Sequence, residues 1–139
     1  MKPLIIIAIS ILCSVTLFSQ GEITINVEDL KSNEGQVIIL LFKKGGGFGV
    51  NKEPFRRLKC TSISNKKASF LITKIERGEY AFLVFHDEDN NGKCNTNWIG
   101  MPQEGVSKSG KSRGIPKFQN SKFLFNGEQK TFNIKMKYL

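Results

Sequence analysis

The sequence predicts an all-β domain, an antiparallel sandwich of about seven strands with one long loop. In several short segments polar and apolar residues alternate, as they do in strands with one buried face. Turn-forming residues separate these segments at short intervals. No window shows the apolar spacing of an amphipathic helix, and strands do not alternate with helices, which argues against α/β folds.

The expected strands lie on both sides of the long loop. They are residues 22–28, 36–42, 58–64, 67–75 and 79–86 before it, and residues 122–125 and 131–138 after it. The second and fifth (QVIILLF and EYAFLVFH) are almost continuously apolar, which indicates central strands. Asn126-Gly127 is a hairpin signal between the last two. This pattern favours a sandwich of the immunoglobulin-like or prealbumin-like kind.

Residues 1–20 have the layout of a secretory signal peptide. A short basic start is followed by an apolar run over residues 4–18 and then by Ser19-Gln20-Gly21. The run is shorter than the roughly 20 residues of a membrane-spanning helix, and no cationic stop-transfer cluster follows it. We therefore expect an exported protein, in the periplasm, on the outer surface or in the medium. After cleavage it would be a single domain over residues 21–139 without a stable membrane span; an uncleaved anchor is the alternative.

The formal charge of the chain is +9 at pH 7. Such a charge favours contact with anionic surfaces, glycans or nucleic acid. Export makes nucleic acid the poorest of these partners, so we expect an envelope or glycan component. A basic surface that only keeps the protein soluble explains the same charge.

Two cysteines, Cys60 and Cys94, remain in the predicted mature chain. An exported protein could join them in a disulfide. The pairing depends on the distance between their Cα atoms, which sequence does not give, so it stays open.

Oxygen-bearing side chains recur in the segment FHDEDNNGKCNTNWIG, residues 85–100. Calcium takes about six to eight oxygen ligands, best supplied from alternate residues around a tight turn. Asp87, Asp89 and Asn91 alternate in this way, and Gly92 follows where the chain must bend. The expected calcium ligands in this loop are Asp87, Asp89, Asn91, the backbone carbonyl of Lys93, and Asn95.

The match to an EF-hand loop fails at its last ligand position, where Trp98 replaces the bidentate glutamate. Flanking helices are also missing, so a strict EF-hand is excluded. Glu104, or Glu88 by a bend, could supply the missing carboxylate. Such a site would be weak, in the range of extracellular modules. A metal-free hairpin in which Asn and Asp side chains bond their own backbone uses the same residues, and spacing leaves both interpretations open.

The segments HDEDNNGK (residues 86–93), NTN (95–97) and GMPQEG (100–105), with PKF at 116–118, carry a resemblance. The chain resembles a family of small exported bacterial proteins, the domain of unknown function DUF2141, over nearly the whole mature chain. The resemblance implies export and a β-sandwich and no established activity. The family usually has Asp where this chain has Asn95 and an apolar residue where it has Cys94. The loss of that charged ligand lowers the expected calcium affinity.

Residues 105–112 match the phosphate-loop pattern G-x-x-x-x-G-K-S. That loop works only between a strand and a helix, and Gly114 and Pro116 prevent a helix here, so we exclude a nucleotide site. We expect instead a mobile basic loop, in contact with an anionic glycan or phosphate or simply solvated. Its candidate ligand-binding residues are Lys108, Lys111 and Arg113.

His86 is the only histidine, which argues against a zinc site. We expect it to bond the loop backbone, and we expect no enzyme. A prealbumin-like hydrolase with His86 as base is an alternative that rests on fold analogy alone. Another is a structural or assembly protein whose edge strands pair with a second chain. Trp98 could stack on a sugar or pack the loop onto the sandwich, and we expect the packing role.

Overall fold

The computed structural model describes residues 21–111 and 114–139. Its elements in chain order are β1 (Ile23–Glu28), β2 (Gln36–Lys43), β3 (Arg56–Cys60), β4 (Ala68–Ile72), β5 (Gly78–Asp87), β6 (Gly105–Lys108), α1 (Phe118–Ser121), β7 (Phe123–Phe125) and β8 (Lys130–Lys135). Each predicted strand segment overlaps one of these strands, although the bounds differ; β3, for example, begins two residues before the predicted segment 58–64. The expected signal peptide lies outside the described residues. Within them, no helix is both long and apolar enough to cross a membrane.

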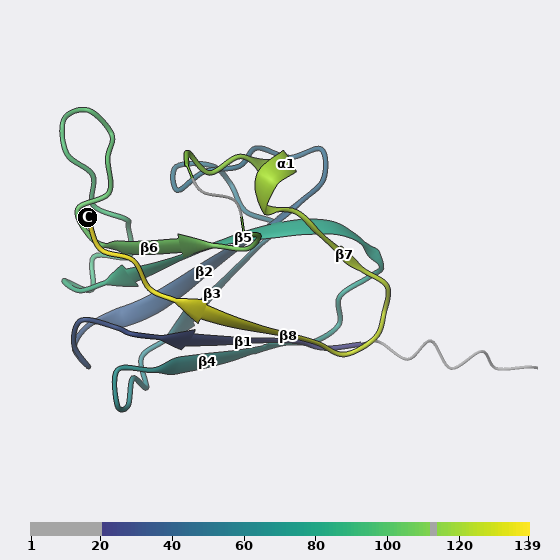
Figure 1. Cartoon of the computed structure of the whole chain (residues 1–139), viewed down its shortest axis with the longest axis horizontal. Coiled ribbons are helices and arrows are strands. Elements are labelled where there is room, and N and C mark those ends of the chain that lie inside the picture. The colour runs from purple at the N-terminus through teal and green to yellow at the C-terminus, as the bar shows by residue number, and fades with distance from the viewer. Residues whose placement is uncertain (1–20, 112–113) are drawn as a thin grey trace, which may run out of the picture.

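Two sheets face each other, which confirms the predicted sandwich (Figure 1). The smaller sheet has the strand order β4-β1-β8. The larger one has the order β3-β2-β5-β6, and β7 also pairs with β5. Among the described strands, every pairing is antiparallel except that of β1 with β8, which run in the same direction.

The hairpin expected at Asn126-Gly127 is wrong. β7 pairs with β5 in one sheet and β8 pairs with β1 in the other, so this turn carries the chain across the sandwich. A type I′ hairpin turn needs φ > 0 at both central residues. Of the two, only Gly127 has it, with φ of 89°.

The central strands β2 and β5 are buried on both faces. One face packs against the three-stranded sheet, where Phe82 contacts Phe132 of β8 with ring centroids 5.1 Å apart. The opposite face forms a second apolar cluster, which residues from loops and from α1 cover. This cluster consists of Ile38, Leu40, Phe42, Leu83, Phe85 and Cys94, with Phe48, Val50, Val106 and Phe118 packed against it. The continuous apolar runs of the two strands follow from this double burial.

The long polar segment is anchored in the larger sheet, so the expectation of a mobile loop from residue 105 onward is wrong for its first part. Gly105–Lys108 is β6, paired with the distal half of β5. Further along, Ser109 closes the gap between β6 and β7 on the same edge of β5. Its hydroxyl accepts the N–H of Phe82 at 2.8 Å and donates to the Ser121 carbonyl at 2.6 Å. The gap therefore leaves no orphaned backbone group at Phe82.

Cys60 and Cys94 are both free thiols. Cys60 packs against the core between the sheets, whereas Cys94 belongs to the cluster on the outer face of the five-stranded sheet. The sheet itself separates the two side chains, so they form no disulfide in this structure.

Candidate metal centre

The pairing of β5 with β6 brings the acidic residues together. β5 ends at Asp87, whose side chain is fully buried. His86 of β5 lies opposite Gly105 of β6. Glu104, the residue just before β6, is therefore placed beside Asp87, although the loop of residues 88–103 separates the two in sequence.

Asp87, Asp89 and Glu104 each offer an oxygen, and these oxygens lie within 4.8 Å of one another. A calcium ion with ligands at about 2.3–2.6 Å can touch oxygens up to about 5 Å apart. Glu104 is thus close enough to supply the carboxylate that the loop lacks at its last ligand position. Glu88, the other residue considered for that role, instead pairs with Lys31 at 3.5 Å.

Backbone N–H groups wrap the Asp87 carboxylate. Its Oδ1 accepts the N–H of Asn91 at 3.1 Å, and its Oδ2 accepts the N–H of Gly92 at 2.8 Å. Gln36, its neighbour on β2, donates its side-chain amide to Oδ2 at 2.6 Å. Gly92 has φ of 77°, a left-handed conformation that favours glycine, so the tight bend predicted at this position is present.

Asp89 sits above this turn and bonds the two asparagines of the loop. Its Oδ2 accepts the side-chain amides of Asn91 at 3.0 Å and Asn95 at 2.8 Å. The Asn91 Oδ1 accepts the N–H of Lys93 at 2.7 Å. The predicted side-chain ligands of the loop therefore lie in one hydrogen-bonded cluster, which Lys93, whose backbone carbonyl was the predicted ligand, joins through its N–H.

Two of the carboxyl groups differ in their tendency to ionise. Burial raises the pKa of Glu104 above its usual value, and the charges of Asp87 and Asp89 raise it further; hydrogen bonds from the N–H groups of Asn95 and Glu88 act in the opposite direction. The hydrogen bond from Asn95 lowers the pKa of Asp89. A cation between them would favour the ionised form of both.

The carboxylates of the cluster have hydrogen-bond partners without an ion and still have open acceptor positions. Within the described residues, every buried side-chain nitrogen or oxygen has a hydrogen-bond partner. A carboxylate has about four acceptor positions. The hydrogen bonds above occupy three on Asp87, three on Asp89 and two on Glu104, so about four remain open. Water or carbonyl oxygens would have to complete a calcium shell of about six to eight ligands.

His86 bonds the backbone of a loop, but this is the loop between β1 and β2 and not the acidic loop that follows it. Its Nε2 lies 2.8 Å from the carbonyl oxygen of Glu34, which can only accept, so Nε2 carries the proton. Nδ1 then accepts the hydroxyl of Tyr138 at 2.8 Å, and that hydroxyl in turn accepts the N–H of Lys31. The ring is fully buried, and it ties the C-terminal segment to the loop between β1 and β2.

Of the other predicted ligand-binding residues, Trp98, Lys108 and Lys111 lie apart from this cluster. Trp98 is 95% exposed, so the interpretation that it packs the loop onto the sandwich is wrong. Lys108 lies at the opposite end of β6 from Glu104, where its Nζ donates to the Asn120 carbonyl at 3.2 Å and burial lowers its pKa. Lys111 is exposed. Arg113 lies outside the described residues.

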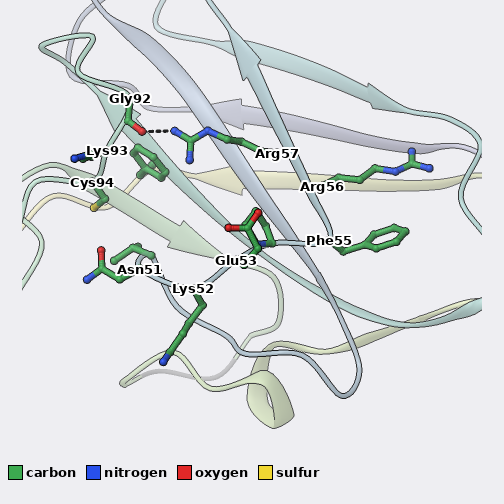
Figure 2. A pocket seen from close by; sticks show the side chains of 12 residues that line it. Asn51, Lys52, Glu53, Phe55, Arg56, Arg57, Gly92, Lys93 and Cys94 are labelled. Carbon is green, nitrogen blue, oxygen red and sulfur yellow. Dashed lines mark hydrogen bonds between the residues drawn. The ribbon is translucent and has the colours of Figure 1, made fainter.

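A groove of about 590 Å³ lies beside the acidic loop, and sequence reasoning missed it (Figure 2). It is lined by residues 50–55, by Arg56 and Arg57 of β3, by Phe85 of β5 and by residues 92–94. Arg57 reaches across to donate to the Gly92 carbonyl, and its guanidinium lies 6.0 Å from the centre of the Phe85 ring. Lys52 and Lys93 add positive charge to this lining. The basic residues of RRLK (residues 56–59) are visible in the sequence as a signal. The groove itself is not, because its other lining residues come from segments distant in the sequence.

A family model matches most of the chain. The family described as "Uncharacterized protein conserved in bacteria (DUF2141)" matches residues 25–133, from β1 to β8, and so includes the acidic loop. No curated protein and no solved structure matches the chain. Because the match covers most of the chain, the protein belongs to the DUF2141 family.

Proposed function

We propose that this β-sandwich is an exported, non-enzymatic module whose acidic loop binds Ca²⁺ and whose basic groove binds an acidic envelope or glycan component. The observation that carries the cation half is the convergence of Asp87, Asp89 and Glu104 within 4.8 Å. The spacing of the first two residues alone fits a hydrogen-bonded turn equally well. The arrival of a third carboxylate from a different strand favours a cation, because bringing like charges together without one is unfavourable.

The donor set favours calcium over zinc. All candidate ligands are oxygens, whereas zinc sites draw mainly on the nitrogen of His and the sulfur of Cys. Burial, together with the charges of Glu104 and Asp87, raises the pKa of the Cys94 thiol to about 11, so this neighbour stays protonated. Because the pKa of Glu104 is raised, we expect a dissociation constant for calcium of about 10⁻⁴–10⁻³ M, the range of extracellular modules. Export would place the protein where calcium at such concentrations occurs.

Loss of a single ligand charge is expected to weaken calcium binding. Asp89→Asn and Glu104→Gln should each lower the affinity about tenfold or more, since calcium affinity depends on the number of charged ligands. Glu76→Gln is the matched control, because Glu76 is exposed and forms an exposed ion pair with Lys43, outside the acidic cluster. Calorimetric titration, with thermal melting alongside, measures the effect. If the wild type shows neither binding heat nor a shift in melting temperature up to millimolar Ca²⁺, the loop is a hydrogen-bonded turn that binds no calcium.

The raised pKa of Glu104 gives a pH dependence with a defined sign. Without calcium the folded protein holds this proton more tightly than the unfolded chain, so the group costs stability as pH rises from about 4.5 through the raised pKa. Calcium binds the ionised form and removes that cost. The difference between melting temperatures with Ca²⁺ and with EDTA should therefore widen as pH rises through this window. In Glu104→Gln the widening should be smaller; equal pH dependence with and without Ca²⁺ in the wild type contradicts the proposal.

The groove supports the partner half of the proposal. Arg57 offers planar N–H donors that suit a carboxylate, sulfate or phosphate group. Lys52 and Lys93 outnumber the single carboxylate, that of Glu53, in this part of the lining. Figure 2 shows the guanidinium of Arg57 directed to Gly92, while that of Arg56 points away, toward the carbonyls of Thr73 and Lys74. Among the described residues, this groove is a better candidate binding site for an acidic sugar than the surface around the exposed Lys111.

Binding to carboxylated and sulfated oligosaccharides on a glycan array tests this half. Arg57→Gln should lower binding about tenfold, the value of a lost charge-assisted contact. Lys59→Gln removes the same charge from the same strand, outside the groove, and should bind like the wild type. Equal loss in both variants would mean that only net charge matters. The recognition half fails if neither the array nor an envelope pulldown yields a ligand for the wild-type protein.

The two alternative functions lack a specific observation in their favour. A hydrolase with His86 as base would need a free ring nitrogen that substrate can reach, but both nitrogens are hydrogen-bonded and the ring is fully buried. Assembly through an edge strand is open to any sandwich with exposed edges. These considerations support the non-enzymatic proposal.

A further inference from the structure

The hairpin of residues 97–101 presents apolar side chains to solvent. Trp98 is 95% exposed, Ile99 56% and Met101 46%. Single exposed apolar residues are ordinary, but adjacent ones gathered at a loop tip indicate an interaction surface. We propose that this tip is a lipid-docking element that inserts into the interface of an anionic bilayer. The inference goes beyond the proposed function, and only its dependence on calcium rests on that function.

Asn97 organises the tip. Its N–H donates to the Met101 carbonyl and its own carbonyl accepts the N–H of Gly100, both at 2.9 Å. Its side-chain Oδ1 accepts the N–H groups of Ile99 at 3.1 Å and Met101 at 2.9 Å. Below the turn, Thr96 and Pro102 form a bridge. The N–H groups of residues 97, 99, 100 and 101 thus have partners within the tip, which lowers the cost of moving this segment into an apolar medium.

The shape of the tip favours a bilayer over a protein partner. Figure 1 shows the connection between β5 and β6 projecting as a loop beyond the body of the sandwich, at the upper left. A stable protein interface buries about 800 Å² on each partner, more than the side chains of one convex turn can supply. A bilayer takes up such a wedge without a preformed pocket. Tryptophan prefers the bilayer interface, and aliphatic side chains bury below it.

A sugar fits the tip less well than a lipid does. Sites for small ligands are concave and combine apolar surface with converging polar groups. At this tip the polar side chain, Asn97, is occupied by the turn itself. Ile99 and Met101 extend the apolar surface beyond the indole ring of Trp98. This extended apolar surface is suited to the boundary between the headgroups and the acyl chains of a membrane.

Charge selects the kind of bilayer and connects the tip to the acidic cluster. The net charge of +9 attracts an anionic surface, but the carboxylates at the foot of the hairpin oppose it locally. Asn95 joins the two, since its N–H donates to Glu104 and its carbonyl accepts the N–H of Gln103 at 2.8 Å. A calcium ion at the cluster would offset this negative charge directly beneath the tip. Docking should therefore be stronger with calcium.

Trp98 is the only tryptophan in the chain, so its fluorescence reports on the tip itself. The experiment adds vesicles of equal parts phosphatidylglycerol and phosphatidylcholine to the purified protein, in Ca²⁺ or in EDTA. The expected result is a blue shift of the emission and quenching by brominated acyl chains. Ile99→Asp and Met101→Asp keep the reporter and should lower the partition coefficient about tenfold or more. Both side chains are exposed, so thermal melting should show that these variants fold.

Leu71→Asp is the matched control, an equal change at an exposed leucine of β4, and it should partition like the wild type. Unchanged Trp98 emission with vesicles in both Ca²⁺ and EDTA would overturn the proposal, as would equal partitioning of Ile99→Asp and the wild type. A blue shift of equal size in Ca²⁺ and EDTA would support the docking tip and remove its calcium dependence. Calorimetry without vesicles then decides separately whether the acidic loop binds calcium.

Discussion

The pairing of β2 with β5, buried on both faces, is the constraint on which the rest of the structure depends. One face of this pair makes the core between the sheets, and the other must be covered by loops and α1. Cys94 contributes to that cover and holds the acidic loop down on the sheet. The same pairing sets Gln36 opposite Asp87, where its amide satisfies a carboxylate that would otherwise be buried without a partner.

The sequence carried the information for the central strands and lacked it for their partners. Runs such as QVIILLF are too apolar to lie anywhere but in a double-sided core, so β2 and β5 could be predicted. β6 could not, because GVSK has neither alternation nor β-branched content beyond Val106. At Asn126-Gly127 the local hairpin signal lost to tertiary packing, since Phe132 and Ile134 of β8 pack against the core between the sheets.

The candidate site, too, could be predicted from the sequence only where its contacts are local. The spacing of Asp87, Asp89 and Asn91 predicted the oxygen-rich turn because its contacts are local. The contribution of Glu104 depends on a strand pairing, so sequence could only name it beside Glu88. The expectation that Trp98 packs the loop onto the sandwich fails, because its side chain is exposed. Exposure is a property of the assembled surface, which is why the apolar tip and the basic groove were not predicted.

The central claim is that the three converging carboxylates form one cation site. The most direct measurement is the anomalous scattering of a crystal of the protein grown with millimolar Ca²⁺. The account predicts a single peak at about 2.3–2.6 Å from oxygens of Asp87, Asp89 and Glu104, with water or carbonyl oxygens completing the shell. A crystal in which this position has no peak, and in which the carboxylates bond only the loop, would contradict it.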